Sequence, residues 1–203
     1  MIDLVNVNKT YFETGAWENI IYTGVPIFKY PTDLWIYQEI IFDVKPTVIV
    51  ETGTCQGGSS LYFADLLDRF SPGGEVITVD ISDQVKVRDP RITYIVGDST
   101  DVEIFAKVKE LIGPDDRVMV SLDSEHLQDH VAKELNLYSS LVTIGSYLIV
   151  EDTFISKYHC EGDRFQEGST FEALQEWLPY NTNFVVDSAR EKHMLSMNPH
   201  GWL

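Results

Sequence analysis

The segment Thr47-Val-Ile-Val-Glu51-Thr-Gly-Thr-Cys-Gln-Gly-Gly-Ser-Ser60 decides the fold, because an apolar run passes directly into a glycine-rich turn and then a helix-like pattern. Gly53, Gly57 and Gly58 allow the backbone to bend sharply and to approach a ligand where a Cβ would clash. The start of the following helix would also offer unpaired N–H groups. The segment therefore predicts a buried strand with a ligand site at its end. A plain tight connection between strand and helix is the alternative.

The residues of this turn indicate which ligand the site would take. The order Gly-x-x-x-Gly-Gly differs from the dinucleotide pattern Gly-x-Gly-x-x-Gly, and the Lys-Ser/Thr of a phosphate-binding loop is absent. Glu51 at the end of the strand is also a poor neighbour for a pyrophosphate. It favours a ligand that carries positive charge, such as the sulfonium and ammonium groups of S-adenosylmethionine.

The composition is that of a soluble globular protein and excludes several classes of partner. The 203 residues suffice for one sizeable core, and a hydrophobic content of 44% is ordinary. The formal net charge of −17 gives an acidic surface that repels phosphate backbones, so nucleic acid is not expected as a partner. Solubility accounts for most of these carboxylates.

Cysteine usage and hydropathy indicate the compartment. Cys55 and Cys160 provide neither a disulfide framework nor metal-ligand spacing, which fits a reducing, cytoplasmic setting and leaves a single disulfide as an alternative. The N-terminus lacks the basic segment and apolar core of a signal peptide. No apolar run approaches the roughly 20 residues needed to span a bilayer, so a membrane is not expected as a partner.

Strand-like and helix-like segments alternate from about residue 31 to the C-terminus. Near-continuous β-branched runs predict core strands at Thr47–Glu51, Glu75–Asp80, Arg91–Gly97, Arg117–Asp123 and Gly145–Glu151. Apolar residues near helical spacing predict helices over 33–42, 59–70, 102–112, 127–142 and 171–178. The alternation is typical of an α/β fold, a parallel sheet covered on both faces, and we expect a single domain over residues 1–203.

Both ends of the chain are expected to depart from this alternation. Phe184–Asp187 and Met194–Met197 predict short strands, and their short connection favours antiparallel pairing at the sheet edge. Residues 1–30 are expected to form an irregular, aromatic-rich cover that includes Trp17, Tyr22 and Tyr30. Nothing in the pattern indicates which part of the sheet they cover.

Acidic residues end or directly follow each predicted core strand. They are Glu51, Asp80, Asp98, Asp123, Glu151 and Asp152. Ligands of open parallel sheets bind outside the carboxyl ends of the strands. Burying several carboxylates together is costly unless cations or hydrogen-bond donors compensate. The pattern therefore predicts a site whose partners are not part of the sequence itself.

Asp80 and Asp98 follow strands expected on one side of the glycine turn. Asp80 is placed to accept hydrogen bonds from the hydroxyl pair of a ribose, and capping of the turn at Ser82 is the alternative. Asp98 is placed near an adenine amino group, and capping of the helix that begins near Asp101 is the alternative.

Asp123, Glu151 and Asp152 form a second group, because the strands that they follow are expected to be neighbours. Three oxygen ligands suit Mg²⁺ or Ca²⁺ rather than zinc, and such an ion can hold a substrate hydroxyl and lower its pKa. His126 lies one loop away and is expected to accept the proton. Helix capping by Asp152 and a solvated loop position for His126 are the alternatives.

Several motifs together resemble the cephalosporin hydroxylase/rhamnosyl O-methyltransferase family of class I methyltransferases. They are Pro31-Thr-Asp-Leu-Trp-Ile-Tyr-Gln38, Glu51-Thr-Gly-Thr-Cys-Gln-Gly-Gly-Ser-Ser60, Leu122-Asp-Ser-Glu-His126 and Gly145-Ser-Tyr-Leu-Ile-Val-Glu-Asp-Thr153. The ending Arg190–Leu203 is also similar, so the likeness runs from about residue 26 to the end of the chain. The pairing of Asp-x-x-His with Glu-Asp-Thr is its most specific part.

The resemblance implies a Rossmann-like, seven-stranded fold that binds S-adenosylmethionine and a divalent cation, Mg²⁺, Ca²⁺ or Mn²⁺. The cofactor site implied at the turn, with Asp98 added by its position, comprises Glu51, Thr52, Gly53, Gly57, Gly58, Ser59, Asp80 and Asp98. The implied metal ligands are Asp123, Glu151 and Asp152, with His126 and Asp123 as the catalytic residues. The implied reaction is methyl transfer to a hydroxyl of a small molecule, expected to be a glycoside. Homo-oligomer formation is left open.

Two other functions fit parts of the pattern. His126 and His130 stand four residues apart and, with Asp123 or Glu134, would mimic the two-His-one-carboxylate site of an iron oxygenase. That arrangement leaves the Glu151–Asp152 pair without a role. A catalytically inactive S-adenosylmethionine-binding protein is the other alternative.

The sequence does not identify the methyl acceptor. Aromatic residues that are candidates for a sugar site are Trp17, Tyr30, Trp35 and Tyr158, with core packing as the alternative for each. The segment Phe154–Thr170 is the expected substrate-facing loop, and it matches no particular acceptor.

Overall fold

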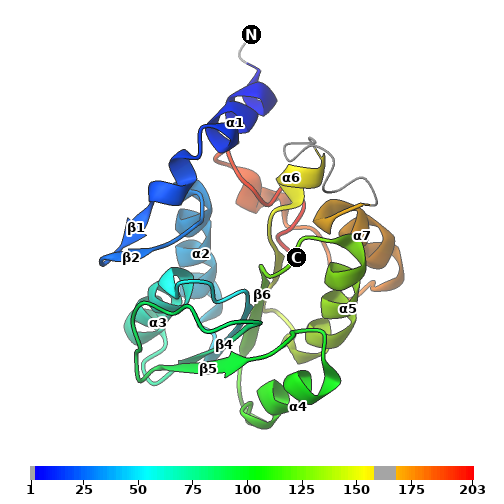
Figure 1. The fold of residues 1–203 in the computed structure, drawn as a ribbon. Helices are drawn as coiled ribbons and strands as arrows, with labels where there is room; N and C mark the ends of the chain where they lie inside the picture. Colours follow the sequence, from blue (N-terminus) through cyan, green and yellow to red (C-terminus); the bar gives the residue numbers. More distant parts are fainter. Residues whose placement is uncertain (1–2, 158–167) are drawn as a thin grey trace.

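A parallel sheet forms the centre of the molecule, which a computed structural model describes over residues 3–157 and 168–203 (Figure 1). Its strand order is β5-β4-β3-β6-β7. The strands are β3 (Val48–Thr52), β4 (Glu75–Asp80), β5 (Ile92–Val96), β6 (Val118–Leu122) and β7 (Leu148–Val150). Strand β3 pairs in parallel with both β4 and β6, so the glycine turn leaves the middle of the sheet, where the strand order reverses.

The core strands lie where the sequence predicted them, because their apolar runs are buried on both faces. Every residue of β3 and of β6 is buried, as expected for central strands of a parallel sheet. Neighbouring residues of β3 point to opposite faces and enter different cores. Ile49 belongs to one buried cluster, and Val48 and Val50 belong to another.

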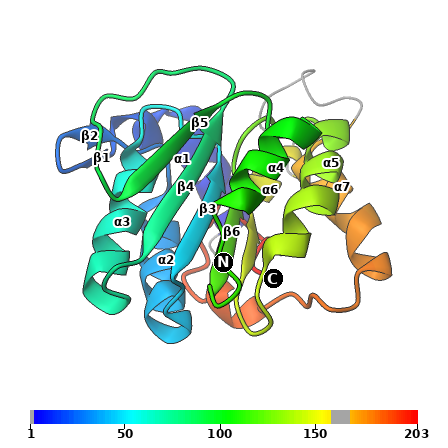
Figure 2. The ribbon, with the colours of Figure 1, turned by 90° about the horizontal axis from the view of Figure 1, so that it is seen from below.

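Helices cover both faces of the sheet, as predicted (Figure 2). On one face lie α2 (Pro31–Val44) and α3 (Gly58–Phe70), and on the other lie α4 (Val102–Glu110), α5 (Gln128–Tyr138) and α7 (Thr170–Trp177). Short helical turns follow α5 and α7, at Ser139–Leu141 and Leu178–Tyr180. The expected Rossmann-like α/β architecture is therefore confirmed.

The first 30 residues are more regular than the sequence indicated. They form α1 (Leu4–Glu13), the 3-10 turn η1 (Ala16–Asn19) and a small antiparallel hairpin of β1 (Ile21–Tyr22) and β2 (Val25–Pro26). Asp3 caps α1 by accepting a hydrogen bond from the Asn6 N–H. Aromatic side chains of residues 1–30 pack against a buried cluster that contains Phe154 and Met197. The N-terminal segment therefore covers the edge of the sheet where the strands end.

The C-terminal segment differs from the expectation. Residues 184–187 and 194–197, both within the described part of the chain, form no strands, and the main sheet of the described residues has five strands rather than seven. Met194 has a left-handed backbone (φ 63°), which interrupts an extended run. The last residues cover the edge of the sheet instead: Leu203 and Leu148 exchange two backbone hydrogen bonds of 3.0 Å, and the Val150 N–H donates to the Gly201 carbonyl at 2.8 Å.

The short helix α6 (Thr153–Lys157), from its second residue on, and the first residue of α7 fall inside the segment expected to be a loop, Phe154–Thr170. Residues 158–167 of that segment, which include the candidate residue Tyr158 and also Cys160, lie outside the described residues. Among the helices of the described residues, none combines the length and the apolar composition that crossing a membrane requires.

Candidate active site

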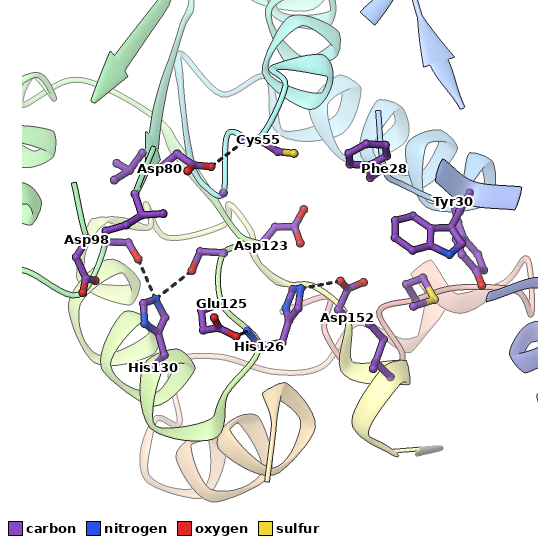
Figure 3. A pocket seen from close by; sticks show the side chains of 18 of the residues that line it. Phe28, Tyr30, Cys55, Asp80, Asp98, Asp123, Glu125, His126, His130 and Asp152 are labelled. Atoms are coloured by element: carbon purple, nitrogen blue, oxygen red, sulfur yellow. Dashed lines mark hydrogen bonds and ion pairs between the residues drawn. The ribbon is translucent and has the colours of Figure 1, made fainter. Parts of the chain in front are cut away.

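A cavity of about 620 Å³ opens at the carboxyl ends of the strands, where ligands of open parallel sheets bind. Figure 3 shows its labelled lining: Asp80 and Asp98 lie toward one end, Phe28 and Tyr30 toward the other, and Asp123, His126 and Asp152 lie between them. Its volume is within the range of small-molecule and cofactor sites. The topology therefore brings together four of the six acids that the sequence placed at the strand ends.

The glycine turn is required by close packing as well as by backbone conformation. Gly53 has φ +88°, and a Cβ there would lie 1.8 Å from the carbonyl oxygen of Asp123. A Cβ on Gly58 would lie 2.1 Å from the carbonyl oxygen of Pro26 in the N-terminal hairpin. Gly57 adopts φ +87° at the N-cap of α3. The turn thus packs closely against both the end of β6 and the N-terminal segment. Gly53 also lines the cavity.

Three residues assigned to the cofactor site lie beneath this turn. Glu51, Thr52 and Ser59 are buried, and neither they nor Gly57 and Gly58 appear among the described residues that line this cavity. Gly58 and Ser59 line a small second pocket beside the turn. The Glu51 carboxylate accepts hydrogen bonds from the hydroxyls of Ser60 and Thr78, the latter at 2.8 Å. Burial raises the pKa of Glu51, although Lys29 and these hydroxyls act in the opposite direction. Direct contact of these three side chains with a cofactor remains a prediction.

Asp80 combines the two roles that the sequence left open. One carboxylate oxygen accepts from the Cys55 N–H at 2.8 Å and the other from the Ser82 N–H at 2.9 Å, so Asp80 holds the glycine turn and the turn after β4. It also lines the cavity. Since a carboxylate oxygen has more than one lone pair, Asp80 keeps capacity for hydroxyl donors.

Asp98 lines the same end of the cavity and does not cap α4. The cap is Asp101, whose side chain accepts from the Glu103 N–H at 2.8 Å. Asp98 accepts instead from the Thr100 N–H at 2.8 Å, and this bond together with the Thr100 hydroxyl lowers the pKa of Asp98. Asp98 is therefore held as an anion at the edge of the cavity.

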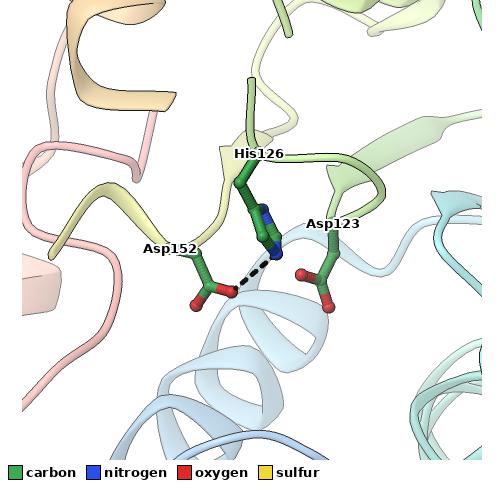
Figure 4. A group of neighbouring side chains, drawn as sticks. All are labelled: Asp123, His126 and Asp152. Atoms are coloured by element: carbon green, nitrogen blue, oxygen red, sulfur yellow. Dashed lines mark ion pairs between the residues drawn. The ribbon is translucent and has the colours of Figure 1, made fainter. Parts of the chain in front are cut away.

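Asp123, His126 and Asp152 form a compact cluster at the ends of β6 and β7 (Figure 4). Each offers one ligand atom, and these atoms all lie within 4.8 Å of one another. His126 Nε2 is 3.2 Å from Asp152 Oδ2. Asp152 has a left-handed backbone (φ 59°), and its N–H donates to Asn198 Oδ1 at 2.9 Å, so the C-terminal segment fixes its position. The two carboxylate oxygens of this group suit a hard divalent cation, and the imidazole nitrogen lies beside them.

Glu151, the third expected ligand, contacts Lys29 and two hydroxyl groups. Its carboxylate accepts from Lys29 Nζ at 2.5 Å, from the Tyr37 hydroxyl at 2.5 Å and from the Ser121 hydroxyl at 2.9 Å. Within the described residues, the group that could hold a metal ion comprises Asp123, His126 and Asp152, and the ligand role of Glu151 remains a prediction.

Lys29 is the functional-site residue that sequence reasoning missed. Its side chain is 2% exposed, and its Nζ lies 2.6 Å from Asp123 Oδ2. Burial alone would lower the pKa of the Lys29 ammonium, but Asp123 and Glu151 raise it above its usual value, so Lys29 is charged. The available signal was a lone lysine in the apolar run Val25-Pro-Ile-Phe-Lys-Tyr30.

The carboxylates at this site are still crowded. Burial and the Glu151 carboxylate raise the pKa of Asp123 well above its usual range, while Lys29 and His126 act against this rise. The ionised form of Asp123 is thus disfavoured at the carboxyl ends of β6 and β7. A bound cation would favour that form.

His130 belongs to a separate polar network. Its Nε2 lies 3.1 Å from the hydroxyls of both Ser99 and Ser124 and 3.6 Å from Glu134 Oε1. Burial lowers the pKa of His130, but hydrogen bonding to Glu134 and its charge outweigh burial and raise it. Within residues 3–157 and 168–203, His130 and His126 do not join a common metal-binding group. This geometry does not fit the iron-oxygenase alternative.

Aromatic side chains form the end of the cavity opposite Asp80. Phe12 and Trp17 are stacked with ring centroids 5.7 Å apart, and Phe28 meets Trp17 edge-on at 5.9 Å. The indole N–H of Trp17 donates to the Phe12 carbonyl at 3.1 Å. Of the aromatic candidates, Trp17 and Tyr30 line the cavity. Trp35 is 57% exposed on α2 and lies outside the cavity lining that the described residues form.

A protein-family model described as rhamnosyl O-methyltransferase/CmcI matches residues 14–203. The chain belongs to this family. The rhamnosyl O-methyltransferase of Mycobacterium tuberculosis (strain ATCC 25618 / H37Rv) is 33% identical over 202 residues, which cover 96% of this chain and 79% of the relative. The rhamnosyl O-methyltransferase of Mycobacterium leprae (strain TN) is 31% identical over 190 residues, or 91% and 82% of the two chains. The expected family, and with it an O-methyltransferase, is confirmed.

Solved structures of methyltransferases share the fold. A structure of CmcI with Mg and SAM has a TM-score of 0.67 at 22% identity, covering 91% of this chain and 75% of that one. MycE from the mycinamycin biosynthetic pathway, in complex with Mg, SAH and mycinamycin VI, has a TM-score of 0.54 at 21% identity, covering 86% and 44%. At these identities the likeness concerns the fold, which agrees with the architecture described above.

The cluster geometry predicts that Asp152→Asn weakens binding of Mg²⁺. We expect the dissociation constant to rise about tenfold or more, because affinity at oxygen-ligand sites follows the number of charged ligands. Calorimetric titration measures this. The matched control is Asp115→Asn, which removes the same charge from an exposed turn at the opposite end of β6. Equal affinity in the two variants would remove Asp152 from the metal site.

Proposed function

We propose that this protein is an S-adenosylmethionine-dependent O-methyltransferase that requires a divalent cation and methylates a hydroxyl of a sugar. The observation that carries the proposal is the order of groups along one cavity. Asp80 and the glycine turn lie at one end, the cluster of Asp123, His126 and Asp152 lies in the middle, and an aromatic wall lies at the other end. A methyl donor and an acceptor at the two ends would meet at the cluster.

The end with Asp80 fits the cofactor. Asp80 and Asp98 offer carboxylate oxygens to the ribose hydroxyls and to the adenine amino group. Gly53 lines the cavity, so the methionine part can approach the backbone of the turn there. Glu51 and the acids beyond the turn favour the positive charge of the sulfonium. Family membership supports the same donor, since the relatives are named as methyltransferases.

The central cluster fits a divalent cation. Asp123 and Asp152 would supply hard oxygen ligands, and water or the substrate hydroxyl would complete the coordination. When bound, the cation holds the acceptor hydroxyl and lowers its pKa. Glu151, which shares its partner Lys29 with Asp123, is the third proposed ligand.

His126 is proposed as the general base. Its Nε2 faces the space between Asp123 and Asp152, so this nitrogen is the atom that accepts the proton of the acceptor hydroxyl. Asp152, 3.2 Å from the same nitrogen, stabilises the imidazolium that forms. Mg²⁺ prefers oxygen ligands, which leaves the imidazole for proton transfer. A positioned base typically contributes about 10²–10⁴-fold, and alignment of donor and acceptor contributes roughly 7–11 kcal/mol.

The aromatic end is proposed to bind the acceptor. Ring faces of Trp17, Phe28 and Phe12 suit the apolar side of a sugar ring or of an attached aglycone rather than a free charged molecule. The relatives support a glycoside acceptor. The mycobacterial enzymes are named for rhamnosyl groups, and a Streptomyces olivaceus relative, 29% identical over 117 residues, is a rhamnosyl tetracenomycin-C 2′-O-methyltransferase.

The assignment of His126 predicts a slow but folded variant. His126→Ala should lower kcat at least about 10²-fold, because the proton of the hydroxyl loses its acceptor. The dissociation constant for S-adenosylhomocysteine should stay close to that of the wild type. Single-turnover methyl transfer to a panel of rhamnosides measures the rate. His193→Ala, an exposed histidine, is the control, and a wild-type rate in His126→Ala would exclude the base role.

The assignment of Asp80 predicts weaker cofactor binding. Asp80→Ala should raise the dissociation constant for S-adenosylhomocysteine by about tenfold or more, because hydrogen bonds to a charged group are lost. Calorimetry measures the constant, and a thermal melt reports whether the turn at Cys55 is still held. Asp83→Ala, at an exposed salt bridge with Arg88, is the matched control. Unchanged affinity in Asp80→Ala would contradict this placement.

A further inference from the structure

A polar network that begins on α5 reaches the end of the cavity proposed for the cofactor. His130 and Ser124 line the cavity, and so does Ser99, which follows β5. His130 Nε2 lies 3.1 Å from the hydroxyl oxygens of both serines (Figure 3). The Ser124 hydroxyl donates to Glu134 Oε1 at 2.7 Å. The Glu134 side chain is 1% exposed, so its carboxylate relies on protein donors rather than on water.

The hydrogen bonds of this network have one consistent direction. Ser124 has a single hydroxyl proton, and its bond to Glu134 uses that proton. Ser124 therefore accepts from His130, because an unprotonated Nε2 would place two acceptors face to face at 3.1 Å. Nε2 thus carries a proton, in the neutral ring as well as in the imidazolium. Since the same N–H faces Ser99 Oγ, the Ser99 hydroxyl accepts from it and keeps its own proton for another acceptor.

Ser99 stands beside an acceptor, Asp98, in the chain and in the lining of the cavity. Asp98 Oδ1 accepts from the N–H and the hydroxyl of Thr100, both at 2.8 Å, which fixes the orientation of the carboxylate. A carboxylate has several lone pairs, so Asp98 can still accept from a ligand. This end of the cavity therefore presents an acceptor beside a donor. Such a pair is complementary to adenine, whose amino donor lies beside ring nitrogens that accept.

We propose that His130 is a positioning residue of the cofactor site, which fixes the Ser99 hydroxyl as the donor to N1 of adenine. The inference rests on the proposed binding of S-adenosylmethionine and adds to it the means by which the base is selected. A hypoxanthine base carries an oxo group and an N1–H in place of the amino group and the bare nitrogen. It would set an acceptor against Asp98 and a donor against Ser99, so the site rejects a deaminated cofactor.

The test compares the affinities for S-adenosylhomocysteine and for S-inosylhomocysteine, its deaminated analogue, by calorimetry. The ratio of the two dissociation constants reports selection of the base, whereas a merely structural role of His130 would weaken both affinities alike. His130→Leu removes the N–H donor. His130→Gln keeps an N–H donor on a side chain of similar reach. The matched control is His193→Leu, at an exposed histidine.

We expect the wild type to prefer S-adenosylhomocysteine by about tenfold or more, because the analogue leaves two polar groups mismatched. His130→Leu should lower this preference about three- to tenfold, since a Ser99 hydroxyl without its donor can turn to accept from N1–H. His130→Gln should keep most of the preference, and His193→Leu should keep all of it. Ser99→Ala should lower the preference as His130→Leu does, and it serves if that variant does not fold.

Three results would overturn the inference and leave the proposed cofactor in place. They are a wild type without preference for S-adenosylhomocysteine, a His130→Leu or Ser99→Ala variant that keeps the wild-type ratio, and a His130→Gln variant that loses as much preference as His130→Leu. If the wild type binds neither compound, the proposed function fails and the inference fails with it.

Discussion

The mutual repulsion of carboxylates at one edge of a parallel sheet is the constraint on which this structure depends. A doubly wound sheet brings the ends of its strands together, and here those ends carry acids. Each acid is offset in a different way: Glu51 by hydroxyls, Asp80 by backbone N–H groups, and Glu151 by Lys29 with Tyr37 and Ser121. Asp123, which is bonded to Lys29, and Asp152, beside His126, face the cavity.

The N-terminal segment is part of the site rather than a cover added to it. It supplies Lys29 beneath the cluster and Phe12, Trp17 and Phe28 at the acceptor end of the cavity. It also fixes the glycine turn, since the Pro26 carbonyl lies where a Cβ of residue 58 would be. One segment thus links the charge balance of the metal site to the surface proposed for the acceptor.

The sequence predicted the parts of this structure that depend on local pattern. Continuous apolar runs located the core strands, and β4 has the predicted bounds Glu75–Asp80. The errors come from long-range contacts. Leu203 occupies the edge of β7 through hydrogen bonds to Leu148, which no local pattern at residues 184–197 indicates. Likewise, the lone Lys29 gives no local sign that it pairs with Asp123, an acid 94 residues away.

The most direct test of this account is to locate the metal. Crystals of the protein grown with Mn²⁺ and S-adenosylhomocysteine give an anomalous signal that places the ion without reference to activity. We predict a single strong peak within coordination distance of carboxylate oxygens of both Asp123 and Asp152. A peak at another position, or none beside this pair in crystals soaked to saturation, would contradict the account.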